Sequence, residues 1–203
     1  MSKGLLATLG CLGVLVLGAL IVAFSIWGTY NDIVARQQDV ESNWAQVQNV
    51  YQRRADLVPN LVATVKGYAA HESQVLEAVT ASRAQVGSIQ VRPDMLNSPV
   101  ELQKFQQAQA GLSSALSRLL LVVERYPDLK ANQNFLELQS QLEGTENRIA
   151  VERRKFNESA QAYNTKIMQF PANVVARLFD FQKKAYFESA PGSEKAPVVD
   201  FSK

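Results

Sequence analysis

The sequence is short of the side chains from which metal and redox sites are built. Its 203 residues include one cysteine, Cys11, and one histidine, His71. A single cysteine excludes a disulfide within the chain. One cysteine and one histidine are also too few for a cysteine- or histidine-rich metal site. His71 stands in the charged stretch AAHESQ, where we interpret it as a solvated or capping side chain. We therefore expect no catalytic residue, no metal and no cofactor.

The sequence also lacks a charge imbalance and has few residues that break helices. Its 21 basic and 19 acidic side chains give a net charge of +2, which is too small to indicate nucleic-acid binding. Its 10 glycines and 7 prolines stand at a few points only. Between residues 35 and 170, Ala, Gln, Leu, Val, Glu and Arg dominate, and these residue types favour helix. The composition predicts an all-α protein.

One long apolar run, residues 5–27, follows a short flank of residues 1–4 and contains no charge. About 20 apolar residues cross the hydrocarbon core of a bilayer as a helix, so the run predicts a transmembrane helix with the bilayer as its partner. Trp27 and Tyr30 stand where membrane-interface anchors are expected. Two alternatives remain: a cleaved signal peptide, although the run is longer than a usual signal core, and a lipoprotein modified at Cys11.

The charges that flank the apolar run predict its orientation. Lys3 and the free amine precede it, and Arg36 is the one basic residue shortly after it. Basic residues favour the cytoplasmic side of a membrane. We expect a single-pass protein of the bacterial inner membrane, with its N-terminus in the cytoplasm and its remaining domain outside.

Residues 28–187 predict a bundle of three long antiparallel helices and a short fourth one, at about 30–86, 99–126, 132–170 and 172–184, followed by a tail at 188–203. Apolar residues recur every three or four positions through the first range, as in a coiled coil. Pro59 lies inside that range, where we predict a kink in a continuous helix. The polar residues on its other face, predicted to be exposed, are Gln37, Asp39, Glu41, Gln46, Arg53, Arg54 and Lys66.

The second and third ranges carry their own boundary signals. Ser98, Pro99 and Glu101 form the pattern of a capping box, which predicts a helix that begins at Pro99. Pro171 ends the third range. Three polar residues fall on the apolar seams of these helices: Gln109, Thr145 and Glu152. We interpret them as a polar layer that sets helix register, with Arg118, Arg148 or Arg154, or an Asn or Gln of a neighbouring helix, as partners for the Glu152 carboxylate. A proton-transfer or ligand role for Glu152 is the alternative.

Three segments together resemble the LemA family. They are the apolar N-terminal span, YNDIVARQQDVESNWAQVQNVYQRRADLVPNLVATVKGYAAHE, and RYPDLKANQNFLELQSQLEGTENRIAVERRKFNESAQAYNTKIMQFPANVVARLF. The likeness extends over about residues 10–187. It implies a single-pass membrane protein with a soluble bundle of long antiparallel helices, in a family without an established enzymatic activity.

The hypothesis for function is a noncatalytic membrane-anchored scaffold or adaptor that binds copies of itself or other membrane proteins. The long apolar seams, the span and the lack of a catalytic constellation favour it. A membrane-remodelling or envelope-stress coat that binds the bilayer is an alternative, although the basic patches are short. An enzyme of unknown type is a further alternative. We expect no nucleic acid and no small-molecule substrate.

Overall fold

The structure, a computed structural model, describes residues 3–90 and 92–188, with the side chains of residues 12–90, 92 and 94–188. Its elements are α1 (Lys3–Tyr68), α2 (Ser73–Ser88), the 3-10 helix η1 (Pro93–Asn97), α3 (Pro99–Val123), α4 (Pro127–Lys130), α5 (Gln133–Met168) and α6 (Ala172–Leu178). No strand occurs among these described residues. The all-α class is confirmed. The predicted tail beyond Glu188, like Met1 and Ser2, lies outside the described residues.

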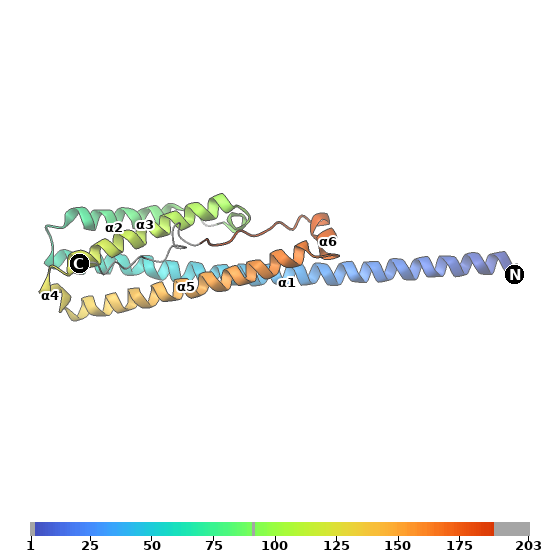
Figure 1. The fold of residues 1–203 in the computed structure, drawn as a ribbon, viewed down its shortest axis with the longest axis horizontal. Helices are drawn as coiled ribbons and strands as arrows, with labels where there is room; N and C mark the ends of the chain where they lie inside the picture. The colour runs from blue at the N-terminus through green and yellow to red at the C-terminus, as the bar shows by residue number, and fades with distance from the viewer. Residues whose placement is uncertain (1–2, 91, 189–203) are drawn as a thin grey trace, which may run out of the picture.

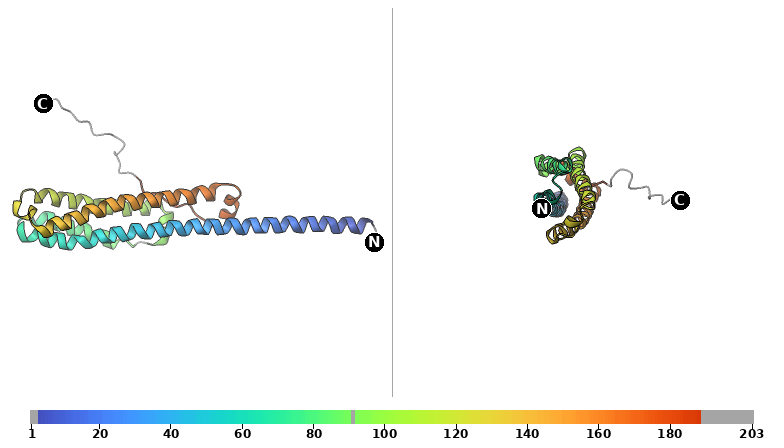
Figure 2. Two further views of the ribbon diagram at one scale, coloured as in Figure 1. Left: turned by 90° about the horizontal axis from the view of Figure 1, so that it is seen from below. Right: turned by 90° about the vertical axis from the view of Figure 1, so that its left-hand side faces the viewer.

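Helix α1 is the axis of the molecule (Figure 1). Its 66 residues make a rod of about 100 Å at 1.5 Å per residue. The first fully buried side chain along it is that of Ile33, and residues 12–25 are all exposed. The apolar N-terminal part of α1 therefore projects from the bundle, as Figures 1 and 2 show. Among the described residues, α1 is the one helix that is both long enough and apolar enough to cross a membrane.

Helix α5 packs antiparallel along the bundle part of α1. Asp32 forms an ion pair with Lys166 at 2.6 Å, Arg54 pairs with Glu146 at 2.8 Å, and Asn132 donates a hydrogen bond to the Tyr68 hydroxyl at 2.9 Å. These contacts keep one register from end to end. Each helix contributes 36 residues to this pairing, which corresponds to about 54 Å.

The predicted single helix over 30–86 is wrong in one respect, because the chain breaks at residues 69–72 and α2 turns back. A straight continuation would carry Leu76 and Val79 past the ends of α3 and α5 into water. The turn instead buries both against α3, so hydrophobic burial outweighs the loss of a few helical hydrogen bonds. The bundle consequently has four antiparallel helices, α1, α2, α3 and α5, joined by short connections.

Helix α1 runs through Pro59 without interruption, so the continuity predicted there is confirmed, while the kink itself stays a prediction. The predicted helix start at Pro99 is also confirmed. The Ser98 side chain accepts a hydrogen bond from the Glu101 backbone N–H at 3.3 Å. The Glu101 carboxylate lies 4.0 Å from Arg92, and the Ser98 N–H donates to the Met95 carbonyl.

The predicted last helix, 172–184, is too long. Helix α6 ends at Leu178, and Asp180 adopts a left-handed conformation with φ 55°. The chain then runs extended from Phe181 to Glu188, a segment we call the strap. Helix α3 likewise ends at Val123 rather than at residue 126, before Pro127 begins α4.

The core of the bundle has two parts along its axis. The first, nearer the projecting end of α1, contains Ile33, Val40, Trp44, Tyr51, Phe105, Ile149, Phe156, Tyr163 and Phe187 among others. The second, toward α4, contains Val58, Leu61, Val65, Leu76, Val79, Leu112, Leu116, Leu119, Phe135 and Leu142 among others. On α1, α3 and α5, a buried polar residue separates the two parts.

Candidate functional site

The most concentrated buried chemistry is a polar layer between the two cores. It contains Arg54 of α1, Gln109 and Ser113 of α3, and Thr145 and Glu146 of α5. Arg54, Gln109 and Thr145 are 1%, 4% and 2% exposed. Each lies between the two cores on its own helix: Arg54 and Gln109 follow the first core and precede the second, and Thr145, on the antiparallel α5, follows the second and precedes the first.

The Arg54 guanidinium joins three helices. Its Nη1 donates to Ser113 Oγ at 2.7 Å and to Glu146 Oε1 at 2.8 Å. Its Nη2 donates to the Gln109 carbonyl at 3.2 Å and also to the Gln109 side-chain oxygen. The charged group lies 5.1 Å from the ring centroid of Tyr51, a favourable cation–π distance. This bonding makes burial of the charge tolerable, since the partners replace water.

The prediction that Arg54 is exposed is wrong. Arg54 follows Tyr51 by three residues and precedes Val58 by four, so helical geometry places it on the seam. Assignment by polarity alone put it on the outer face. This spacing was the signal that could have identified Arg54. The next residue, Ala55, lies beside the seam and is only half-buried.

The predicted polar residues differ in where they lie. Gln109 and Thr145 lie in the polar layer, where the Thr145 hydroxyl donates to the Gln141 carbonyl at 2.7 Å. Glu152 lies at the edge of the seam, with its side chain 17% exposed. Its carboxylate is partly exposed and pairs with Lys155 of the same helix at 2.9 Å, rather than with one of the three arginines proposed for it. The solvated Lys155 ammonium stabilises this carboxylate at the edge of the seam, so no buried partner is needed.

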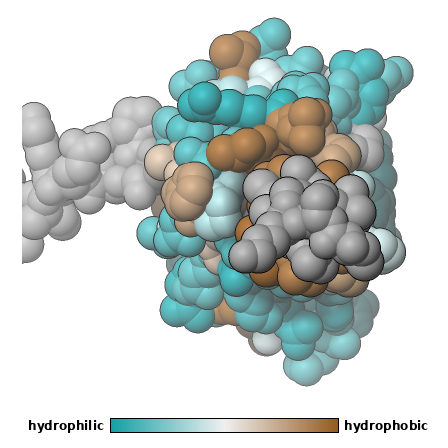
Figure 3. All heavy atoms as spheres, turned by 90° about the vertical axis from the view of Figure 1, so that its right-hand side faces the viewer, coloured by the Kyte–Doolittle hydropathy of each residue, from teal (hydrophilic) through white to brown (hydrophobic). Residues whose placement is uncertain are grey.

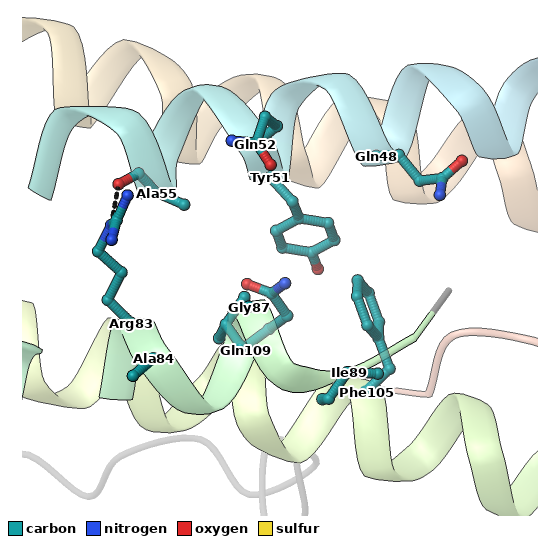
Figure 4. A pocket seen from close by; sticks show the side chains of 11 residues that line it. Gln48, Tyr51, Gln52, Ala55, Arg83, Ala84, Gly87, Ile89, Phe105 and Gln109 are labelled. Carbon is teal, nitrogen blue, oxygen red and sulfur yellow. Dashed lines mark hydrogen bonds between the residues drawn. The ribbon is translucent and has the colours of Figure 1, made fainter. Parts of the chain in front are cut away.

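A cavity of about 300 Å³ opens beside the polar layer, between α1, α2 and α3 (Figure 4). Tyr51 of α1 points into it toward Gln109 of α3, and Arg83 extends from α2 to α1 at one end of it. Arg83 Nε donates to the Ala55 carbonyl at 2.9 Å. This is the carbonyl that Pro59, four residues later, leaves without its helical donor. The arginine therefore replaces a lost backbone hydrogen bond and also ties α2 to α1.

The strap is held by two asparagines of α5, which sequence reasoning did not single out. Asn164 donates to the Lys184 carbonyl and accepts from the Lys184 N–H, both at 2.8 Å. Asn157 makes the same pair of bonds with Phe187, at 2.9 and 2.8 Å. Seven residues of helix and three of extended chain both span about 10 Å, so the two periods coincide. Phe187 of the strap thereby closes the first core over Trp44, at 5.9 Å between ring centroids.

Burial shifts the pKa of two groups where the strap packs against the bundle, Tyr163 of α5 and Lys184 of the strap. It raises the pKa of the Tyr163 phenol to about 12, and the Glu41 charge acts in the same direction. Burial also lowers the pKa of the Lys184 ammonium, which the Glu41 charge partly offsets. Lys184 Nζ donates to Asn97 Oδ1 at 2.8 Å and lies 5.7 Å from the Tyr163 ring centroid. These contacts account for a buried lysine without an ion pair.

The other predicted positions lie at the two ends of the bundle. Trp27 is 67% exposed on the projecting part of α1, and the Tyr30 ring packs 4.9 Å from that of Phe179. His71 is exposed in the turn between α1 and α2. Among the described residues, no group of three or more His, Cys, Asp or Glu side chains is placed to hold a metal ion. The arrangement joins and aligns helices: both Nη atoms of Arg54 bond to neighbouring helices, and its buried Nε has no hydrogen-bond partner among the described residues.

Sequence comparisons relate the chain to a known family. The sequence profile of the LemA family matches residues 43–201. The chain is 27% identical to magnetosome protein MamQ 2 of Paramagnetospirillum magneticum over 88% of its length and 72% of that protein. It is 26% identical to magnetosome protein MamQ of Magnetospirillum gryphiswaldense over 98% of its length and 78% of that protein. It is 27% identical to protein LemA of Metamycoplasma hominis, over 84% and 74%.

Proposed function

The chain belongs to the LemA family, and we propose that it acts as a noncatalytic, membrane-anchored helical scaffold or adaptor. It would hold its bundle near a bilayer and present the outer faces of its helices to partner proteins or to copies of itself. The observation that carries this proposal is the continuity of α1, which joins an exposed apolar rod to the bundle without a flexible linker. A rigid connection suits a protein that presents a binding surface at a fixed distance from the bilayer.

The membrane anchor is supported by what surrounds the projecting part of α1. Large apolar side chains such as Leu15, Leu17 and Ile21 are each more than 60% exposed there and contact no other helix of the described chain. Exposure of this much contiguous apolar surface to water is unfavourable. A bilayer removes it from water, so residues 5–27 are proposed to bind lipid.

The noncatalytic part of the proposal is supported by the use of the buried polar groups. Arg54, Gln109 and Asn164 all bond to helices or to the strap. An enzyme of this size would place a nucleophile or base in a cavity. To test it, His71→Ala should leave every phenotype of the gene unchanged, since the sole imidazole lies in an exposed turn. Loss of a phenotype in a folded His71→Ala protein would favour an enzyme.

The scaffold role can be tested with photo-crosslinking residues in the full-length protein in native membranes. Exposed apolar positions on the sides of the bundle are suitable, namely Leu121, Leu136 and Val151. We expect discrete adducts of higher mass, to a partner or to a second copy, from at least one position. Monomer alone from all three positions, with the protein correctly folded, would contradict the scaffold role.

The proposed topology places the N-terminus in the cytoplasm and the bundle outside the bacterial inner membrane. Leu121→Cys in a Cys11→Ala background supplies one accessible thiol on α3. In intact spheroplasts, a membrane-impermeant maleimide should label that thiol. Labelling only after the cells are lysed would reverse the orientation but leave the anchor in place.

A further inference from the structure

The end of the bundle from which α1 projects carries an apolar collar that no part of the described chain covers. Its members share large apolar side chains and high exposure: Met168 58%, Phe170 84%, Val174 58%, Leu178 70% and Phe179 49%. They belong to the end of α5, the connection to α6, α6 itself and the residue that follows it, Phe179. Figure 3, viewed from this end, shows hydrophobic residues beside the projecting helix within a mainly hydrophilic rim.

Helix α6 is apolar on two sides, which sets it apart from an ordinary surface helix. Ala172, Val175 and Ala176 are buried against the bundle. Val174 and Leu178, one helical turn apart, point outward. A helix of a soluble bundle normally keeps its outer face polar. The outward apolar face therefore requires a partner other than water.

The position of the apolar collar along α1 identifies that partner. The Phe179 ring packs against Tyr30 at 4.9 Å, and Phe179 shares a shallow groove with Ala23 and Trp27. Ala23 lies inside the proposed span, about 6 Å below its end at Trp27. Phe179 consequently stands at the depth where the span meets water, which is the interfacial region favoured by aromatic side chains.

The remaining surface supports a bilayer rather than a protein as the occupant. The opposite end of the bundle is polar, with an ion pair between Arg125 and Glu72 at 3.0 Å and another between Lys130 and Glu124. The apolar collar thus marks one end of the molecule only, the end at which lipid would lie. Nearby exposed charges, Arg177 and Lys183 against Asp180, leave a small positive excess suited to anionic headgroups.

We propose that the apolar collar is a second membrane contact, in which Phe170, Val174, Leu178 and Phe179 enter the interfacial region of the bilayer that α1 spans. Such contacts reach about 5–10 Å into the boundary between headgroups and acyl chains. Together with α1 they form two points of attachment, and two points restrict the tilt of the bundle on the membrane. This inference rests on the anchor of the proposed function.

Depth-dependent fluorescence quenching tests the contact on the full-length protein. The protein, in a Cys11→Ala background, carries an environment-sensitive dye at Leu178→Cys and is reconstituted into vesicles of phosphatidylcholine and phosphatidylglycerol. Spin-labelled lipids place the quencher either near the headgroups or deep in the acyl chains. We expect Leu178→Cys to lose emission strongly with the shallow quencher, weakly with the deep one, and to resist aqueous iodide.

Two matched positions calibrate the measurement. Leu20→Cys, within the span, should be quenched by the deep lipid, and Leu121→Cys, as exposed as Leu178 but on the side of α3, should respond to iodide alone. If Leu20→Cys responds to lipid while Leu178→Cys behaves like Leu121→Cys, the apolar collar is open to water and the inference is wrong. Protection of Leu178→Cys from both lipid and iodide would indicate a protein cover and also overturn it. Failure of Leu20→Cys would remove the anchor itself.

Discussion

At the scale of single residues, loss of the ion pair between Arg54 and Glu146 should destabilise the bundle more than loss of an exposed ion pair on the same helix. Glu146→Ala removes the carboxylate, itself 40% exposed, from an arginine that is 1% exposed and that keeps its bonds to Gln109 and Ser113, so we expect a loss of about 1–2 kcal/mol in the free energy of unfolding. Glu158→Ala, also on α5, removes an exposed pair with Arg154 at 3.8 Å and should change it by less than about 1 kcal/mol. Chemical denaturation of both variants checks this, and equal losses would contradict a buried polar layer.

Pro59 and Arg83 should be energetically coupled, because the proline frees the Ala55 carbonyl to which the arginine donates. Arg83→Ala alone should cost about 1–2 kcal/mol, since that carbonyl is left without a donor. With Pro59→Ala present, the new N–H of residue 59 supplies the helical bond, and the same change should cost less. A double-mutant cycle measures the difference. No coupling between the two sites would show that the Arg83 bond has another role.

Tyr163 should make stability fall at alkaline pH. Its pKa is about 12 in the folded protein against an ordinary value near 10, so the folded state retains a proton that the unfolded state releases. The stabilisation that comes from the protonated phenol is fully present below pH 10. As the pH rises toward 12, the free energy of unfolding falls by on the order of 2 kcal/mol. Denaturation between pH 9 and 11 should show a steeper decline for the native protein than for Tyr163→Phe. Parallel curves would contradict the assignment.

At the scale of elements, the strap and α5 provide the clearest test, through Asn157 and Asn164. Asn164→Ala should destabilise the protein by about 2 kcal/mol, because the Lys184 N–H and carbonyl lose their partners where they are buried. Asn147→Ala, at an exposed position of the same helix, is the control and should have little effect. Amide hydrogen exchange should accelerate at Lys184 in Asn164→Ala and at Phe187 in Asn157→Ala. Unchanged exchange at both amides would exclude this attachment.

The elements also show which parts of the fold follow from sequence pattern. Helix period, the Ser98 cap and Pro171 predict the all-α class and most helix boundaries, because these signals are local. The turn at residues 69–72 contains no proline or glycine and depends on burial of Leu76 against α3, a tertiary effect that propensity does not contain. The hydrogen bonds of the strap are likewise absent from local pattern, since they go to side chains of a distant helix.

The polar layer was predicted only in part, and the difference lies in how each residue was assigned. Gln109 and Thr145 were found because they interrupt an apolar seam. Arg54 was missed because its charge was taken to place it on the outer face, and Glu152 was over-interpreted because lysine on its own helix can neutralise it at the seam's edge. Arg54 and Glu152 both have apolar neighbours three and four residues away, so this spacing places each on its seam, but only the tertiary partners determine which of them is buried.

At the scale of the whole molecule, α1 is a rod that is hydrophobic at one end and carries the bundle at the other. Continuity of α1 across this boundary means that forces on the bundle pass directly to the span, since no linker absorbs them. The apolar collar would add a second attachment at the same height. A scaffold built in this way would present its side faces to other proteins in a restricted range of orientations.

Extraction of native membranes at alkaline pH tests the central claim most directly. The full-length protein should stay with the membrane fraction. Leu15→Arg combined with Ile21→Arg, two exposed positions without contacts to the bundle, should shift it toward the soluble fraction, because each charge is unfavourable in the bilayer by about 2.5–3.5 kcal/mol. Recovery of the native chain in the aqueous fraction without detergent would contradict the account.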